Sequence, residues 1–354
     1  MIASSQRISP KAMVTDIDSL RQDIMRRAQA AVSLDIAYIG VANGLFAALD
    51  EIGSASPSRL AAQAEMDDGY VIRWCDAAYA FELIDEAVDG EFQLTPLGRA
   101  FMPEQPGTLM PFAVQSMLSA HMSERAAGLM RSGERPGERV LGERETILPW
   151  FGPMLEHQFG PLLEKQVVDQ VPTFRVVDER GGLAVDLGCG NGWYLRTLAR
   201  RCSHLRGIGL DGFDENISQA TRLAEQEELD KRLNFAVGDI HNFHIEEPVD
   251  LISMNRALHH VWDEKENVFR ILREHLRPGG AAVIWEPNWP ARRSDLRSPP
   301  RRGMAFQNLS EHVQGTHFLR PEEIAEQFRA VGLEPEVHFV ADGRDVIVTG
   351  TLAA

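Results

Sequence analysis

A glycine-rich turn containing Gly188, Gly190 and Gly192 is the stretch whose residue types point most clearly to chemistry. It follows an apolar run at 183–187 that reads as a strand, and the helix expected over 193–202 begins directly after it. The glycines let the main chain approach a ligand closely, and the N-terminus of the helix offers free N–H groups. The turn therefore predicts a cradle for a nucleotide-type ligand.

Acidic residues stand at the ends of three successive predicted strands. Asp186 lies at the mouth of the turn, where a carboxylate repels pyrophosphate and suits an ammonium group. Asp211 ends the strand expected over 206–210, a position from which an acid can hold both hydroxyls of a ribose. Asp239 follows the strand expected over 233–237. We therefore expect a cationic ligand without phosphate.

Five short motifs follow one another in the C-terminal half of the chain. They are D-L-G-C-G-N-G at 186–192, I-G-L-D at 208–211, V-G-D-I at 237–240, the strand expected over Val249–Asn255, and L-R-P-G-G at 276–280. Several motifs in one order are more specific than any one of them. The run resembles the class I S-adenosylmethionine-dependent methyltransferases, whose catalytic domain is an α/β, Rossmann-like, seven-stranded fold. The alternative is an unrelated α/β turn with acids at its strand ends by chance.

The resemblance implies that S-adenosyl-L-methionine is the cofactor. By this resemblance the three glycines border the methionine part, Asp211 holds the ribose and Asp239 holds the amino group of adenine. The cofactor-binding residues that we predict are Asp186, Gly188, Gly190, Gly192, Asp211, Gly238, Asp239, Ile240 and Asn255.

The N-terminal part has a different pattern. Apolar residues three or four apart predict helices over about 18–50, and further helices are expected near 57–64 and 69–83, followed by a small hairpin ending in Leu94-Thr95-Pro96-Leu97-Gly98. This resembles the winged-helix dimerisation domain of small-molecule O-methyltransferases. We therefore predict an N-terminal helical dimerisation domain at 1–131, a linker and substrate-facing helix at 132–160, a catalytic domain at 161–354, and a homodimer.

Histidines follow the fourth predicted strand, at Leu258-His259-His260-Val261-Trp262. The stretch resembles the L-H-D-W-x-D-E segment of small-molecule O-methyltransferases, in which the histidine is the general base. The resemblance assigns that role to His259, with Glu286 holding it. His260 stands where that family has Asp, and the second acid expected near 316–320 is missing. A structural role for His259, or His260 or His317 as the base, stays open.

Composition limits the classes of partner. The chain has 354 residues and a formal net charge of −16, so neither nucleic acid nor an anionic membrane is expected to bind it. Three cysteines and the lack of an apolar leader or spanning run favour a cytoplasmic protein.

His241 and His244 lack further ligands to complete a metal site, and we expect no metal. Five arginines at 292–302 are either a solvated face or contacts for an acidic substrate.

The function predicted from the sequence is methyl transfer from S-adenosylmethionine to a small-molecule acceptor of secondary metabolism. Two other classes remain possible. One is an enzyme that consumes the cofactor without methylating an acceptor, for example by intramolecular cyclisation. The other is a winged-helix transcriptional regulator with a ligand-sensing methyltransferase domain, which the acidic balance of the chain disfavours.

Overall fold

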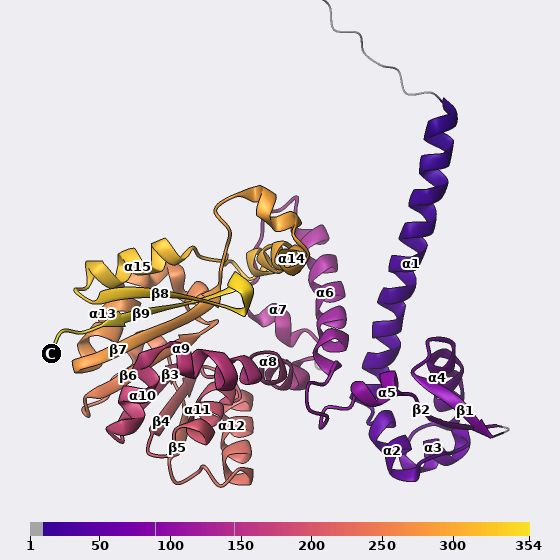
Figure 1. Cartoon of the computed structure of the whole chain (residues 1–354), viewed down its shortest axis with the longest axis horizontal. Coiled ribbons are helices and arrows are strands. Elements are labelled where there is room, and N and C mark those ends of the chain that lie inside the picture. Colours follow the sequence, from indigo (N-terminus) through magenta and orange to yellow (C-terminus); the bar gives the residue numbers. More distant parts are fainter. Residues whose placement is uncertain (1–9, 89, 145) are drawn as a thin grey trace, which may run out of the picture. The chain divides into compact units, whose positions relative to one another are not determined.

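The computed structural model describes residues 10–88, 90–144 and 146–354 (Figure 1). The first helix, α1 (Pro10–Ala42), is followed by α2 (Leu45–Ile52). The sequence pattern predicted helix across this whole region, and the break falls at Gly44, whose φ of 65° is left-handed and therefore suits glycine. No single helix among the described residues is long and apolar enough to cross a bilayer; α1 and α2 pass that test only as a pair bent by 70°.

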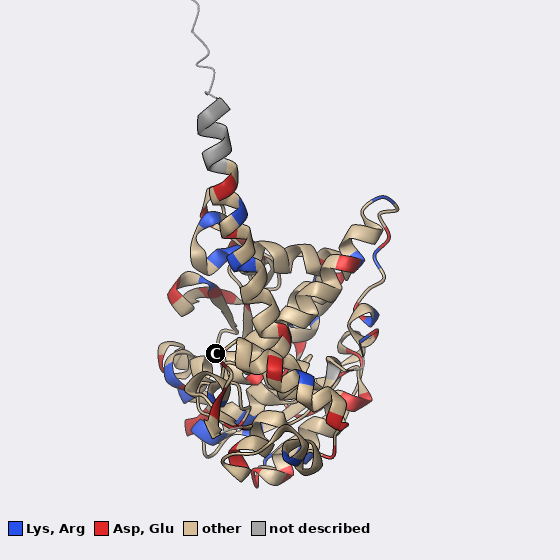
Figure 2. Cartoon of the chain, turned by 90° about the vertical axis from the view of Figure 1, so that its right-hand side faces the viewer, with Lys and Arg blue, Asp and Glu red and all other residues tan. Residues whose placement is uncertain are grey.

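The described surface of α1 mixes charges with apolar side chains. Arg21 pairs with Asp18, and Arg26 and Arg27 pair with Asp23, all at helical spacing, so blue and red segments alternate along this helix (Figure 2). Six large apolar side chains of α1 are between 45% and 61% exposed: Ile17, Leu20, Ile24, Met25, Val32 and Ile39. A helix this apolar on its outside has surface available for a partner.

Two short helices and a hairpin follow. α3 (Pro57–Gln63) is capped by Ser56 and α4 (Asp68–Ala80) by Asp67, each of which accepts a backbone N–H through its side chain. β1 (Ile84–Val88) and β2 (Glu91–Leu94) pair antiparallel. Thr95 caps α5 (Pro96–Ala100), and Gly98 has no room for a side chain, because a Cβ there would lie 2.0 Å from the carbonyl oxygen of Leu83.

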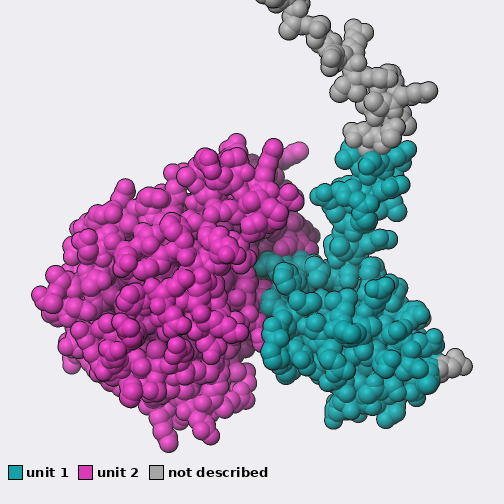
Figure 3. All heavy atoms as spheres, in the orientation of Figure 1, with its two compact units in different colours: residues 1–118 teal, residues 119–354 magenta. Residues whose placement is uncertain are grey.

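The chain divides into two compact units, residues 1–118 and 119–354 (Figure 3). The division falls within α6 (Met110–Leu129), whereas the domain boundary predicted at 131 follows that helix. The three-part division predicted from the sequence stays a prediction. Short helical segments lead on to the sheet: α7 (Arg139–Gly142), α8 (Leu148–Leu162), the π-helical η1 (Leu163–Val167), α9 (Val168–Gln170) and α10 (Pro172–Glu179).

A seven-stranded sheet is the centre of the second unit. Its spatial order is β5-β4-β3-β6-β7-β9-β8. The strands are β3 (Leu183–Leu187), β4 (Arg206–Asp211), β5 (Leu233–Val237), β6 (Val249–Asn255), β7 (Leu276–Pro287), β8 (Glu334–Val340) and β9 (Asp345–Thr351). Strands β3 to β7 are parallel, and β9 is antiparallel to both β7 and β8. The predicted α/β, seven-stranded fold is thereby confirmed.

Helices cover both faces of this sheet (Figure 1). The elements that connect or follow the strands are α11 (Trp193–Arg201), α12 (Asp214–Gln226), η2 (Ile240–Asn242), η3 (Leu258–Glu264), α13 (Lys265–His275), η4 (Arg293–Arg297), α14 (Pro299–Val313), α15 (Pro321–Ala330) and η5 (Ala341–Gly343). Alternate residues of β3 enter different cores: Ala184 packs with residues of α10, α11 and α12, whereas Val185 packs with residues of α13 and α15.

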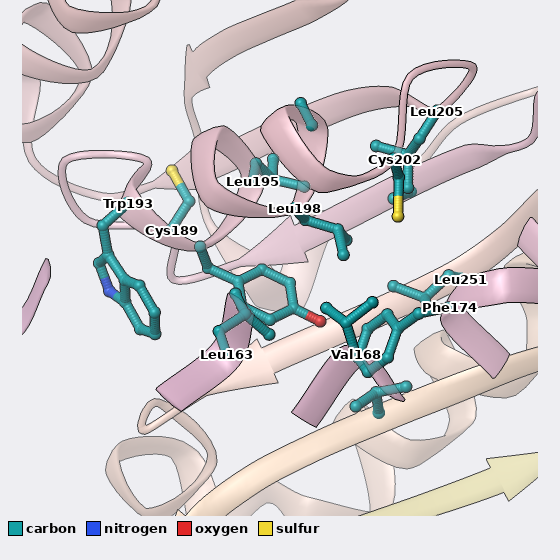
Figure 4. Packing of buried hydrophobic residues seen from close by; sticks show 14 of the residues in the cluster. Leu163, Val168, Phe174, Cys189, Trp193, Leu195, Leu198, Cys202, Leu205 and Leu251 are labelled. Atoms are coloured by element: carbon teal, nitrogen blue, oxygen red, sulfur yellow. The ribbon is translucent and has the colours of Figure 1, made fainter. Parts of the chain in front are cut away.

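The first of these cores contains the start of α11 (Figure 4). Trp193, Leu195 and Leu198 are buried there with Phe174 of α10 and Leu251 of β6. Since β3 is buried along its full length, the position of the glycine turn that follows it is fixed by packing on both faces of the sheet.

Candidate functional site

The glycine turn is held against the end of the neighbouring strand. The amides of Gly188 and Cys189 donate to the carbonyl of Leu210 at 2.8 and 3.0 Å, and the amide of Gly190 donates to Asp211 Oδ2 at 2.8 Å. Gly188, Gly190 and Gly192 have φ values of 78°, 53° and 73°, a region that side chains disfavour. A Cβ at Gly190 would meet no described atom within 4 Å, so the turn faces open space there.

Asp186 is buried beneath the turn and organises the strand beside it. Its Oδ1 accepts from Ser253 Oγ at 3.0 Å and from Asn255 Nδ2 at 2.7 Å. Burial raises the pKa of this carboxyl to about 7, although both hydrogen bonds lower it. The amide oxygen of Asn255 takes no part in these hydrogen bonds.

Some buried side-chain atoms next to the turn have no hydrogen-bond partner among the described residues. They include Asn191 Nδ2, a donor, and Asn255 Oδ1, an acceptor. Unpaired buried polar atoms are costly and therefore point to a missing ligand. A donor and an acceptor at one edge match the carboxylate and the ammonium group of an amino acid. Asn191 was not predicted as a site residue; its place inside the glycine motif was the available signal.

The predicted ribose and adenine residues lie at the ends of β4 and β5. Asp211 is 8% exposed and accepts from Phe213 N and Asn216 Nδ2 at 3.0 Å each, besides the amide of Gly190. Asp239 is exposed and caps η2 by accepting from the amide of His241 at 2.9 Å. Gly238 and Ile240 flank it and are partly buried. The sheet therefore brings the predicted cofactor residues to one edge, the carboxyl ends of β3 to β6.

His259 lies between two carboxylates. Its Nδ1 is 2.7 Å from Glu286 Oε2, and its Nε2 is 3.5 Å from Glu311 Oε2. Glu286, at the end of β7, is fully buried, and His259 is 4% exposed. The expectation that a second acid is missing is therefore wrong. Glu311 of α14 supplies it, and Thr316 Oγ1, inside the stretch where the acid was sought, donates to this carboxylate at 3.1 Å.

The two carboxylates decide the protonation of His259. Burial lowers the pKa of the imidazole, but the charges and hydrogen bonds of Glu286 and Glu311 outweigh burial and raise the pKa to about 10. The same contact lowers the pKa of Glu311 despite its burial. His259 is therefore an imidazolium at neutral pH, with a proton on each ring nitrogen.

His260 has a carboxylate of its own. Its Nδ1 lies 2.9 Å from Glu138 Oε1, and the two imidazole rings are 4.2 Å apart between centroids. Glu138 precedes α7, in the segment predicted to be a linker, where no motif marked it as a site residue. Its pKa is lowered, chiefly by the hydrogen bond to His260.

The other predicted histidines lie elsewhere. His241 Nδ1 is 3.1 Å from Glu264, and His244 packs against the ring of His275. Among the described residues, one group brings three ligand-type side chains within 4.8 Å of one another, and it consists of His259, His260 and Glu311. In that group both nitrogens of His259 already face carboxylates. The expectation of a metal-free site stays a prediction.

Comparisons with known proteins agree with this architecture. Residues 184–280 match the family described as "Methyltransferase domain". An uncharacterised 37.1 kDa protein of a Streptomyces fradiae transposon is 39% identical over 111 residues, which are 31% of this chain and 31% of that protein. The chain thus matches about a third of the length of that curated relative.

Solved structures match over nearly the whole chain. An O-methyltransferase family protein from Burkholderia thailandensis has a TM-score of 0.70 at 19% identity, covering 96% of this chain and 98% of the other. Human N-acetylserotonin methyltransferase, solved in complex with S-adenosylmethionine, has a TM-score of 0.68 at 16% identity, covering 99% and 100%. At these identities the likeness establishes the fold.

The pKa of His259 makes the free energy of unfolding depend on pH. Because the folded-state pKa of about 10 lies above the unfolded value of about 6.5, this contribution is complete below pH 6.5 and is lost as the pH rises through 10. Urea unfolding gives the free energy of unfolding at pH 6.5 and at pH 10. Between these pH values the free energy of unfolding should fall by more than about 1 kcal/mol further in the native protein than in His259→Asn, which lacks the imidazole that binds the proton. Equal losses in the two proteins would contradict the assigned ionisation.

Proposed function

The chain carries a class I S-adenosylmethionine-dependent methyltransferase domain, and on that premise we propose that it transfers a methyl group from S-adenosylmethionine to a small-molecule acceptor. The observation that carries the proposal is the position of the His259–Glu286 pair. His259 lies four residues after Asn255, the last residue of β6, and β6 is the parallel neighbour of β3, after which the cofactor cradle follows, so the histidine and the cradle lie at the same edge of the sheet.

The residues present fit the cofactor. The unpaired atoms of Asn191 and Asn255 complement the amino-acid part of the cofactor beside the glycine turn. Asp186, buried at the end of β3, would lie near the ammonium group of that part. Asp211 is placed for the ribose, and the stretch 238–240 for the adenine. When bound, S-adenosylmethionine supplies an electrophilic methyl group on a positively charged sulfur.

We assign His259 the role of general base for the acceptor, with Glu286 as its positioning residue. Glu286 fixes the ring by accepting from Nδ1 at 2.7 Å, which leaves Nε2 to exchange a proton. Glu311 lies 3.5 Å from Nε2, which makes this hydrogen bond long and weak, so an acceptor hydroxyl can compete for this nitrogen. Uncharged His259 takes the hydroxyl proton on Nε2, which leaves the acceptor oxygen with an electron pair to receive the methyl group that S-adenosylmethionine would supply, with S-adenosylhomocysteine as the leaving group. His260, with Glu138, is the second candidate for this role.

This assignment predicts a particular pH dependence. Since only uncharged His259 can accept a proton, kcat/KM should rise about tenfold per pH unit from pH 7 towards 10. Glu311→Gln removes one of the carboxylates that raise the pKa, so its profile should level off at lower pH, whereas His259→Asn should lose about 10²- to 10⁴-fold in rate.

The test uses S-adenosylmethionine with a deuterated methyl group and a panel of phenols, amines and enols, read by mass spectrometry. Methylthioadenosine is monitored in the same samples, because it would reveal cofactor consumption without methyl transfer. An unshifted profile in Glu311→Gln would exclude His259 as the base. A native protein that binds the cofactor and methylates no member of a broad panel would count against the proposed reaction.

We also propose that the N-terminal part is a winged-helix dimerisation domain and that the enzyme is a homodimer. The exposed apolar side chains of α1 support this, since burying them against a second copy of the chain would remove them from water.

The double variant Ile24→Asp with Leu20→Asp should be a monomer in analytical ultracentrifugation, where the native protein should be a dimer. The control is Arg21→Asp with Arg27→Asp, which also adds aspartates to α1 but leaves its exposed apolar side chains in place. A native protein that sediments as a monomer at micromolar concentration would contradict the proposal.

The proposal further places the enzyme in the cytoplasm, without nucleic acid or membrane as partner. Cys75, Cys189 and Cys202 are buried free thiols, which agrees with a reducing compartment. On α4, the helix that would have to read DNA in the regulator alternative, Arg73 donates to the carbonyl of Gly69 on its own helix. Salt-sensitive binding to duplex DNA, or recovery in a membrane fraction, would contradict this placement.

A further inference from the structure

Carboxylates outnumber cations around His259. Glu138, Glu286 and Glu311 converge there on two imidazoles, those of His259 and His260. Even with both imidazoles protonated, the cluster keeps one uncompensated negative charge. Glu138 is the outermost member, with 40% of its side chain exposed, whereas Glu286 is fully buried.

The members of this cluster respond mainly to one another. The charged groups that shift the pKa of Glu138 are His260, His259 and Glu311, and those that shift the pKa of Glu311 are His259 and His260. The excess negative charge therefore belongs to the cluster itself, and it attracts a cationic group and repels an anionic group placed next to it.

Aromatic rings adjoin the same cluster. Phe318 is 4% exposed and meets the His259 ring edge to face, with 5.6 Å between centroids. Trp289 is partly buried, and its ring centroid lies 6.3 Å from that of Phe318. Carboxylates together with aromatic faces are the surroundings that stabilise an organic ammonium group.

Three of the arginines that follow β7 have partners outside this cluster. Arg301 donates to the carbonyl of Gly343 at 2.7 Å, Arg302 donates to the carbonyl of Arg297, and Arg292 pairs with Asp295. Arg293 and Arg297 are exposed. In this segment, a candidate contact for an acidic substrate in the sequence, Arg292, Arg301 and Arg302 are thus engaged with partners other than Glu138, Glu286 and Glu311.

We propose that the methyl acceptor carries a protonated amine, which binds beside Glu138 and Glu311, and that carboxylate-bearing acceptors are rejected. This inference rests on the proposed function, because it concerns the acceptor side of the same site. It commits the enzyme to acceptors such as hydroxylated aromatic amines, whose hydroxyl group faces His259 while the ammonium group faces the outer carboxylates.

Two probes of similar size and opposite charge test the proposal. Tyramine and 4-hydroxyphenylacetate share a phenol ring and differ in the charged group at the end of the side chain. Their dissociation constants are measured by calorimetry and saturation-transfer NMR on the full chain, with EDTA present to remove metal cations that the cluster could also attract. Each titration is run with and without S-adenosylhomocysteine.

The native protein should bind tyramine at least about tenfold more tightly than 4-hydroxyphenylacetate, since one uncompensated charge near a protein surface is sufficient for such a ratio. Glu138→Gln should reduce the ratio by about tenfold, because it removes the outermost carboxylate and keeps its shape. The matched control is Glu143→Gln, at the end of the same short helix, where the carboxylate pairs with Arg125 outside the cluster. The control should leave the ratio unchanged.

Equal binding of the two probes, tighter binding of the acid, or absence of tyramine binding at millimolar concentration would overturn the proposal. The same holds for an equal effect of Glu138→Gln and Glu143→Gln. Failure of the proposed function looks different: S-adenosylhomocysteine would not bind, while the preference between the two probes could still be measured without it.

Discussion

A buried carboxylate at the end of a central strand is the constraint on which the site depends. Asp186 lies below the glycine turn and joins β3 to β6 through Ser253 and Asn255. A buried ionised carboxylate is costly unless hydrogen bonds and a nearby positive group offset it, and two hydrogen bonds alone leave the pKa raised to about 7. Burial therefore makes the ionised form of Asp186 costly, and a cation bound nearby would reduce that cost. The same hydrogen bonds orient Asn255, from which the chain continues directly to His259.

On the acceptor side, the cost of burying charges is likewise set against their attraction, here between His259 and Glu286. An ion pair as buried as that between His259 and Glu286 is weak evidence of stabilisation, since removing two charges from water costs several kcal/mol. Its retention next to the cradle is better explained by function. Glu286 sets the orientation of the ring, and Glu311 sets how strongly the proton is held. In the proposed reaction, His259 is charged at rest and must lose its proton before it accepts another.

Local sequence predicted the parts of the molecule that depend on local rules. The strands expected at 233–237 and 249–255 begin and end where the structure has β5 and β6, because apolar runs bounded by turn residues specify buried strands. The break at Gly44 was not predicted, since the apolar spacing continues across it. His259 and Glu286 were found together because both belong to motifs at strand ends.

The remaining site residues depend on tertiary contacts. Glu311 lies inside α14, on a helix without a recognisable motif, and meets His259 only in the folded chain. Glu138 belongs to a charged, glycine- and proline-containing stretch that resembles a linker, and its partner is more than a hundred residues away. No periodicity connects positions so far apart in sequence. Both carboxylates changed the chemistry assigned to the site, from a single histidine–acid pair to an acidic cluster.

The edge formed by β3, β4 and β6 is the proposed binding site for S-adenosylmethionine. Calorimetric titration of the purified chain with S-adenosylmethionine and S-adenosylhomocysteine, beside Asp211→Ala and the surface control Asp230→Ala, tests it most directly. The account predicts binding at micromolar concentration in the native protein and the control, and its loss in Asp211→Ala. A folded native protein that binds neither ligand, or an Asp211→Ala variant that binds both as well as the native protein does, would contradict it.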